Sequence, residues 1–128
     1  MPVKETHLTD AVFDQLRHAM AADTASLTAL YRDYLADARE SLQALHESLQ
    51  AGQLDEVRAK SHYLRSSSLV LGAQQVARCA AGLEEAAGSG HAAQCNDLLE
   101  KMETAVSSLQ NELRGRLGSG VMSTDEAA

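Results

Sequence analysis

The stretch KSHYLRSSSLVLGA, residues 60–73, decides how the rest of the chain is interpreted. In this stretch and just before it, residues that suit a buried helix face recur every three or four positions, namely Leu54, Val57, Ser61, Leu64, Ser68 and Leu71. This period predicts one buried stripe along a helix. At ~100° per residue, His62 lies about 130° from the centre of the stripe, so we expect its imidazole to face water.

The outer face of this helix carries a cation and small side chains around His62. Arg65 and Ser66 follow the histidine by three and four positions, which places them on its face one turn further on. Leu69 adds an apolar side chain that the buried stripe does not need. Gly72 is a usual helix stop, because glycine readily adopts the left-handed conformation. The pattern indicates a docking site with a nucleophile at its centre.

Composition favours one domain of packed helices. The chain has 128 residues, of which 45% are hydrophobic but only 3% aromatic, and its one proline is Pro2. A core rich in alanine and leucine and poor in aromatic residues suits helices and argues against a sheet, and the chain is long enough for one continuous core. The net charge of −7 disfavours nucleic acid and anionic membranes as partners, since both require a basic surface.

We expect a cytoplasmic protein without a bound metal or other cofactor. No apolar run is long enough to span a membrane, and residues 1–10 lack the apolar core of a signal peptide. Cys79 and Cys95 lack metal or redox spacing, which favours reduced thiols. The histidines other than His62 form no i, i+4 pair with one another or with a cysteine. The absence of an ATP-binding motif argues against kinase activity of this chain alone.

Periodicity and helix caps divide the chain into five helices. We predict a short helix capped by Thr9 or Asp10, followed by helices at about 24–50, 54–71, 73–87 and 92–117. Short turns make neighbouring helices antiparallel. The predicted fold is therefore all-α, an antiparallel four-helix bundle with a short N-terminal capping helix. Residues 1–7 are expected to be a flexible lead-in, residues 8–117 the bundle and residues 118–128 a flexible tail.

The central stretch resembles the signature of histidine-containing phosphotransfer (HPt) domains. In that signature a histidine is followed by a leucine, a basic residue, small residues and Gly-Ala; here these are His62, Leu64, Arg65, residues 66–68 and residues 72–73. The resemblance implies a helical bundle over about residues 8–117, with the exposed His62 as phosphoacceptor. Two positions depart from the pattern: the family more often has lysine at Arg65 and usually has glycine at Ser66.

The resemblance also implies roles for three neighbours of His62. Arg65 would balance the charge of about −2 that a phosphoryl group adds, and the small Ser66 would leave room for a partner's loops. Family members often place a polar residue some 22 positions after the histidine to hydrogen-bond its ring, and this position holds Glu84, a candidate for orienting the imidazole. The simpler alternatives are a solvated Glu84 and an Arg65 that pairs with a glutamate of the next helix.

The resemblance implies response-regulator receiver domains, a hybrid histidine kinase or both as partners, in bacterial two-component signalling. Mg²⁺ would belong to the partner receiver, because this chain has no carboxylate cluster for it. Leu69, Tyr63 and Arg58 are the candidate partner-binding residues, and we expect a monomer. The alternative function is a non-catalytic helical adaptor that binds a receiver or another partner through the His62/Leu69 face. An adaptor would tolerate loss of His62 and depend on Leu69.

Overall fold

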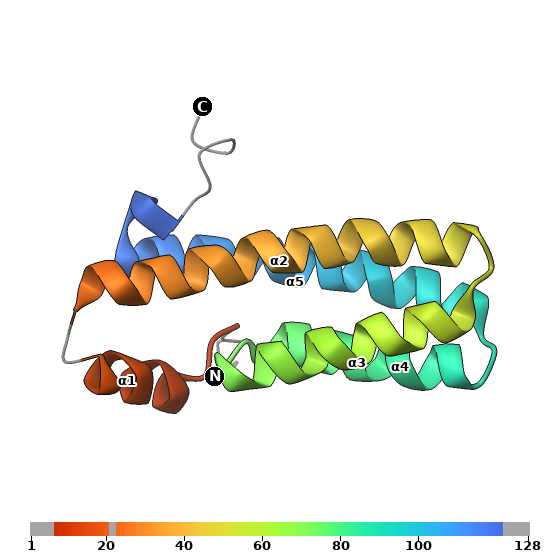
Figure 1. The fold of residues 1–128 in the computed structure, drawn as a ribbon, viewed down its shortest axis with the longest axis horizontal. Coiled ribbons are helices and arrows are strands. Elements are labelled where there is room, and N and C mark those ends of the chain that lie inside the picture. Colours follow the sequence, from red (N-terminus) through yellow and green to blue (C-terminus); the bar gives the residue numbers. More distant parts are fainter. Residues whose placement is uncertain (1–6, 21–22, 122–128) are drawn as a thin grey trace, which may run out of the picture.

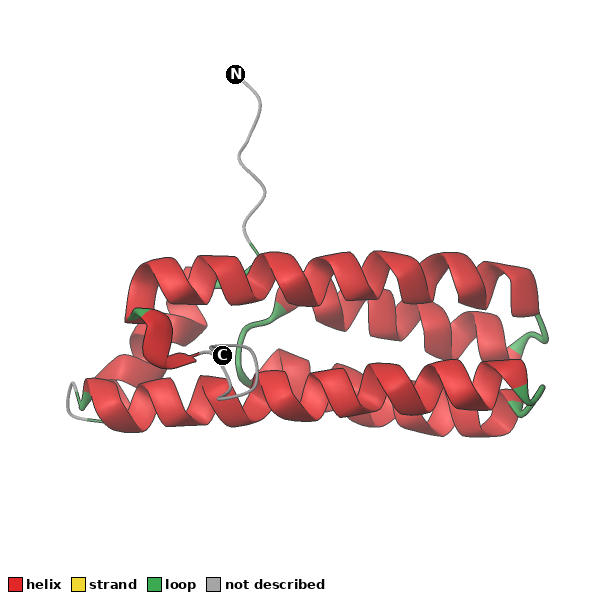
Figure 2. Ribbon diagram, turned by 90° about the horizontal axis from the view of Figure 1, so that it is seen from above, coloured by secondary structure: helices red, strands yellow, loops and turns green. Residues whose placement is uncertain are grey.

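The computed structural model describes residues 7–20 and 23–121, and the regular secondary structure of these residues is entirely helical (Figure 1). The elements are α1 (Asp10–Ala19), α2 (Thr24–Gln50), α3 (Leu54–Val70), α4 (Gln74–Gly88), α5 (Ala92–Leu117) and one 3₁₀ turn, η1 (Ser119–Val121). Helices α2 to α5 form a long antiparallel bundle (Figures 1 and 2). Because α2 and α5 extend past α3 and α4 at one end, α1 fits beneath that extension (Figure 1). The predicted fold class is confirmed.

The three turns inside the bundle share one geometry. Gly52, Gly72 and Gly90 have φ values of 71°, 75° and 77°. In the turn after α3, the Gly72 amide donates to the Leu69 carbonyl at 3.2 Å and the Ala73 amide donates to the Ser68 carbonyl at 2.9 Å. This is a Schellman motif, which satisfies carbonyls at the end of a helix and needs a residue in the left-handed conformation. Gly72 therefore ends α3, as its type and position predicted.

One core runs through the bundle and is built mainly from leucine and alanine. On α3 the buried residues are Val57, Ser61, Leu64 and Ser68, which is the stripe that the sequence period predicts. Cys95 is buried and Cys79 is half-buried, and burial raises the pKa of both thiols. Neither cysteine is therefore poised as a thiolate. No helix of the described residues is both long and apolar enough to cross a bilayer.

Two tyrosines of α2 hold the C-terminal end of α3. The Tyr31 hydroxyl donates to the Leu71 carbonyl at 2.9 Å, and the Tyr34 hydroxyl lies 2.6 Å from Ser68 Oγ. Burial raises the pKa of each tyrosine to about 12, so both hydroxyls are neutral at pH 7. Because each buried hydroxyl has a partner, the polar groups cost little and fix the helix that carries His62 against α2.

Helix α1 caps the end of the α3–α4 hairpin at which the Gly72 turn joins the two helices. The Thr9 amide donates to the Gly72 carbonyl at 2.7 Å. Phe13 is buried, with its ring centre 5.9 Å from that of Tyr31. Arg116 of α5 lies 5.1 Å above the Phe13 ring and pairs with Asp10 at 2.5 Å. These contacts bind α1 to three helices of the bundle or their ends, which is the capping role that we expected.

The first residues of the expected flexible tail pack against the bundle. Residues 119–121 form η1, and Val121 is fully buried where η1 packs on α2 and α5. The reason is that these two helices extend past the others and offer apolar surface, which the Val121 side chain covers. The rest of the predicted tail, residues 122–128, and residues 1–6 of the predicted lead-in lie outside the described residues.

Candidate functional site

His62 lies midway along α3 on its outer face. Its side chain is 57% exposed, while the predicted stripe on the opposite side of the helix is buried. The helical period alone produces this arrangement, since His62 is far from the stripe in angle. The prediction of an exposed imidazole is confirmed.

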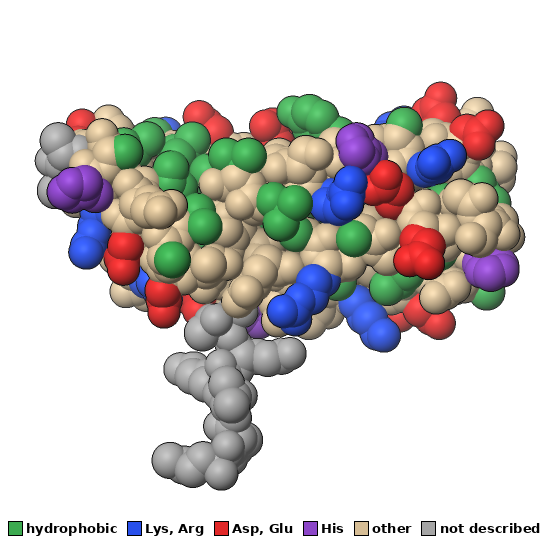
Figure 3. All heavy atoms as spheres, turned by 90° about the horizontal axis from the view of Figure 1, so that it is seen from below, with side chains coloured by type: hydrophobic (Ala, Val, Ile, Leu, Met, Phe, Trp, Pro, Cys, Tyr) green, Lys and Arg blue, Asp and Glu red, His purple; other side chains and the backbone are tan. Residues whose placement is uncertain are grey.

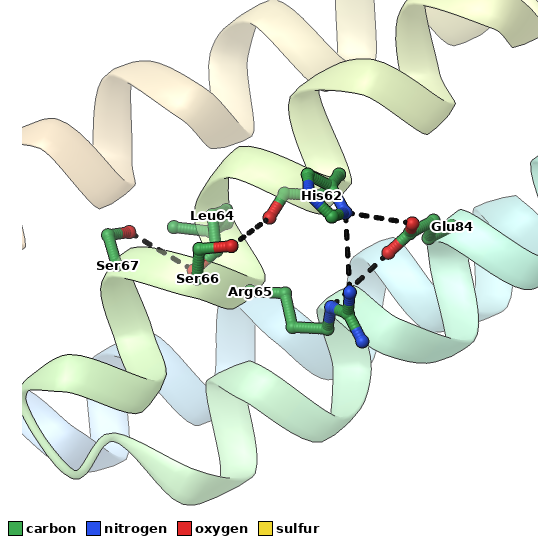
Figure 4. A network of polar contacts seen from close by, with 6 residues as sticks. All are labelled: His62, Leu64, Arg65, Ser66, Ser67 and Glu84. Carbon is green, nitrogen blue, oxygen red and sulfur yellow. Dashed lines mark hydrogen bonds and ion pairs between the residues drawn. The ribbon is translucent and has the colours of Figure 1, made fainter.

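Glu84 of α4 contacts the His62 ring (Figure 4). Its Oε1 atom lies 2.9 Å from His62 Nδ1, and its side chain is only 23% exposed. A carboxylate can only accept, so the proton of this hydrogen bond lies on Nδ1. The neutral ring is then the Nδ1–H tautomer, and Nε2 keeps its lone pair. The contact predicted from the spacing of 22 positions is present; the role of Glu84 in orienting the ring stays a prediction.

Arg65 joins this pair from the next turn of α3. Its Nε lies 3.3 Å from Glu84 Oε2, and its Nη2 lies 3.3 Å from His62 Nδ1 (Figure 4). Since Nδ1 already donates to Glu84, two donors face each other in the second contact, which is proximity rather than a strong hydrogen bond. Arg65 therefore pairs with a glutamate of the next helix, the simpler alternative left open above. The same ion pair also holds its guanidinium beside the imidazole.

Ser66 is exposed next to His62, but its hydroxyl is engaged with the helix backbone. Ser66 Oγ donates to the His62 carbonyl at 3.1 Å, as Ser67 Oγ does to the Leu64 carbonyl at 3.1 Å (Figure 4). Serine commonly bonds back to the preceding turn of a helix in this way. The hydroxyl thus points along the helix, and the small side chain leaves the imidazole accessible.

Two solvent-open hollows flank the cluster of His62, Glu84 and Arg65, both between α3 and α4. One, of about 560 Å³, is lined by Asp55, Arg58, Ala59, His62 and Glu84. The other, of about 470 Å³, is lined by Arg58, Arg65, Ala81, Glu84, Glu85, Gly88 and Ser89. Both are shallow surface depressions rather than enclosed pockets, which suits contact with a macromolecule better than retention of a small molecule.

Exposed apolar side chains continue from the site along α3. Tyr63, Leu69 and Val70 are 64%, 58% and 68% exposed. The surface of the lower helix layer in Figure 1, viewed in Figure 3, mixes hydrophobic, basic, acidic and histidine side chains. Exposure of Leu69 and Tyr63 agrees with the sequence analysis, whereas their contact with a partner stays a prediction. Within residues 7–20 and 23–121, no group of three or more His, Cys, Asp or Glu side chains is placed to hold a metal ion.

Comparison with known protein families identifies the chain. A family model described as the Hpt domain matches residues 29–112, a span that contains His62, Arg65, Ser66 and Glu84. The chain belongs to the Hpt family. This confirms the resemblance seen in the central stretch, and it gives the Hpt protein a phosphotransfer role in two-component signalling. The family implies receiver domains and histidine kinases as its class of partners.

A solved structure agrees with this assignment. The protein is similar to histidine-containing phosphotransfer protein B (HptB) from Pseudomonas aeruginosa PAO1, with a TM-score of 0.80 and 27% sequence identity. The similarity covers 88% of this Hpt protein and 96% of the HptB chain. No curated protein matches the sequence. The likeness therefore extends over nearly the whole bundle, including the helix that carries His62.

Arg58, expected from the sequence only as a partner contact, also lies beside the site. Arg58 lines both hollows, one of them together with His62. Its spacing was the available signal, because Arg58 precedes His62 by four positions and Arg65 by seven, so that all three share one face of α3.

Proposed function

We propose that this Hpt protein carries a phosphoryl group on Nε2 of His62 and exchanges it with the aspartyl phosphates of receiver domains. The observation that carries the proposal is the 2.9 Å hydrogen bond between His62 Nδ1 and Glu84 Oε1 on an imidazole that is 57% exposed. This bond uses Nδ1 as a donor and leaves Nε2 as the ring nitrogen with a free lone pair. An exposed nucleophile without a pocket suits a partner that brings the phosphoryl group in its own active site.

In the proposed step, the Nε2 lone pair attacks the phosphorus of the partner's aspartyl phosphate. The N–P bond forms as the P–O bond to the aspartate breaks, and the carboxylate leaves with the bonding electron pair. The ring keeps its Nδ1 proton and becomes a positively charged phosphoimidazolium beside the Glu84 carboxylate. Glu84 thus stabilises charge that develops during transfer. The reverse step passes the phosphoryl group to a receiver.

The surrounding residues support this chemistry from fixed positions. Arg65 is held beside the ring by its ion pair with Glu84 and offsets part of the incoming negative charge. Ser66 leaves space for the partner's loops, and Leu69 and Tyr63 provide exposed apolar contacts. Mg²⁺ would be bound by the receiver, because the described part of this chain has no cluster of carboxylates placed to hold it. We propose that the protein is a monomer and that it acts in the cytoplasm, where such receivers operate.

Incubation of the Hpt protein with a panel of phosphorylated receiver domains tests the function. We expect at least one receiver to transfer its label, and we expect the label on the Hpt protein to be acid-labile and base-stable, as an N-linked phosphoryl group is. Label stability is measured by treatment of the isolated protein with acid and with alkali. Tight binding to a receiver without any label would contradict the proposal and favour the adaptor function.

Replacement of Glu84 by glutamine is expected to slow phosphotransfer roughly 10- to 100-fold without unfolding the protein. The amide oxygen of glutamine still accepts from Nδ1, but the negative charge that stabilises the phosphoimidazolium is lost, and hydrogen bonds to charged groups contribute about 1.5–3 kcal/mol. Initial rates of label transfer from one receiver measure the effect. Glu85→Gln is the matched control, because Glu85 is the exposed neighbour on α4 without a contact to His62 among the described residues. Equal rates in the two variants would remove Glu84 from the mechanism.

A further inference from the structure

We infer that Arg58 is a second cation for the phosphoryl group and turns from its resting place on α4 toward phosphorylated His62. The inference rests on the proposed phosphorylation of His62. It concerns a residue that has no contact with the ring in the unphosphorylated protein. Its basis is the position of Arg58, the local charge and the place where its side chain rests.

Arg58 and Arg65 flank His62 from the two adjacent turns of α3. Residues three and four positions apart on a helix have Cβ atoms about 5–6 Å apart, so both arginines are near neighbours of the histidine. Arg58 and His62 also line the same hollow, of about 560 Å³. Arg58 therefore borders the same surface depression as the ring that is to carry the phosphoryl group.

Phosphorylation of His62 gives the cluster of His62, Glu84 and Arg65 a net negative charge, which a further cation would balance. In the unphosphorylated protein, the positive charge of Arg65 is balanced by Glu84 at 3.3 Å. Phosphorylation makes the ring positive and adds about −2 on the phosphoryl group, so this cluster changes from about neutral to about −1. Asp55, which also lines the hollow, adds to the negative charge. Of the described residues that line the two hollows, Arg58 is the cation that makes no ion pair with a carboxylate.

The Arg58 side chain is held only weakly in its position on α4 in the unphosphorylated protein. A Cβ atom built on Gly88 would lie 3.6 Å from Arg58 Nε and 3.7 Å from its Cδ, so the side chain extends across the last residue of α4. Helix carbonyls there carry partial negative charge that attracts a cation weakly. Charge-assisted hydrogen bonds to phosphoryl oxygens are stronger than this attraction. Because Arg58 has no ion pair to break, the phosphoryl group is the better partner.

The experiment uses chemical phosphorylation, so that it does not depend on any receiver. Phosphoramidate transfers its phosphoryl group to a histidine nitrogen and releases ammonia. The ³¹P NMR signal of phosphorylated His62 is assigned as the one that His62→Gln lacks, and it is followed as a function of pH. A nearby cation favours the dianionic phosphoryl group, so Arg58→Gln should raise the pH midpoint of its second ionisation by about 0.5 unit, a roughly threefold change in the ionisation constant.

Two further variants separate direct contact from a structural effect. Arg58→Lys restores the positive charge and should return the midpoint most of the way to the wild-type value. Arg32→Gln removes an equal charge from an exposed position on α2 outside both hollows, and it should leave the midpoint unchanged. A wild-type midpoint in Arg58→Gln, or a shift of equal size in Arg32→Gln, would overturn the role of Arg58. A wild-type protein that phosphoramidate cannot label at His62 would instead overturn the proposed function, and the inference with it.

Discussion

Replacement of His62 by glutamine is expected to abolish acceptance of phosphoryl groups while leaving the unfolding temperature of the protein unchanged. The amide nitrogen of glutamine has no lone pair available for attack on phosphorus, so we expect a loss of at least about 10³-fold, the scale on which removal of a nucleophile acts. The stability cost is small, because the side chain is 57% exposed and its polar contacts among the residues described are with Glu84 and Arg65. Exposed substitutions of this kind usually change the free energy of unfolding by less than about 0.5 kcal/mol. Label transfer from a receiver and thermal unfolding by circular dichroism measure the two effects.

His46 provides a matched control for this prediction. It lies on α2, its side chain is 41% exposed and, like His62, it pairs with a glutamate of a neighbouring helix, Glu103 of α5. His46 contacts its glutamate through Nε2, however, whereas His62 contacts Glu84 through Nδ1. The nitrogen that we propose attacks in His62 is therefore occupied in His46, and His46→Gln should keep full labelling. A His62→Gln variant that still accepts label, or loss of labelling in His46→Gln, would contradict the assignment.

Exposure of His62 could be predicted because it follows from one helix and its period. The buried stripe through Leu64 fixes the outer face of α3 without any knowledge of the neighbouring helices. The contact between His62 and Glu84 could not be predicted from the period of one helix, because it depends on the register between α3 and α4. A tight turn at Gly72 joins α3 to α4 and sets this register, and the family's usual spacing encodes it.

Contacts between distant parts of the chain could not be predicted in the same way. The Tyr31 hydroxyl bonds to a carbonyl 40 positions away, and Arg116 pairs with Asp10 across 106 positions. Neither contact produces a periodic pattern in the sequence, since each depends on the positions at which whole helices end. Burial of Val121 is of the same kind. Its short segment looks like a tail from its glycines and serines, and only the protruding ends of α2 and α5 give it a place to pack.

Substitution of Gly72 by alanine is expected to destabilise the protein by about 3 kcal/mol and lower its unfolding temperature by roughly 10 °C. Two costs add at this position. The backbone has φ of 75°, which an alanine adopts at a cost of about 1 kcal/mol or more. A Cβ atom would also lie 2.9 Å from Val12 Cβ and 3.2 Å from Val12 Cγ1, so α1 would have to move away from the end of α3.

Gly52→Ala separates the two costs. Gly52 has φ of 71° in the same type of turn, but a Cβ atom there would meet nothing within 4 Å. The Gly52→Ala variant should therefore lose only the free energy that the backbone conformation costs, about 1 kcal/mol. Urea unfolding of both variants measures the difference in their free energies of unfolding. Since the extra loss at Gly72 comes from contact with α1, an equal loss in the two variants would mean that α1 does not sit against the end of α3. A larger loss at Gly72 would instead show that the capping helix stabilises the end of the helix that presents His62.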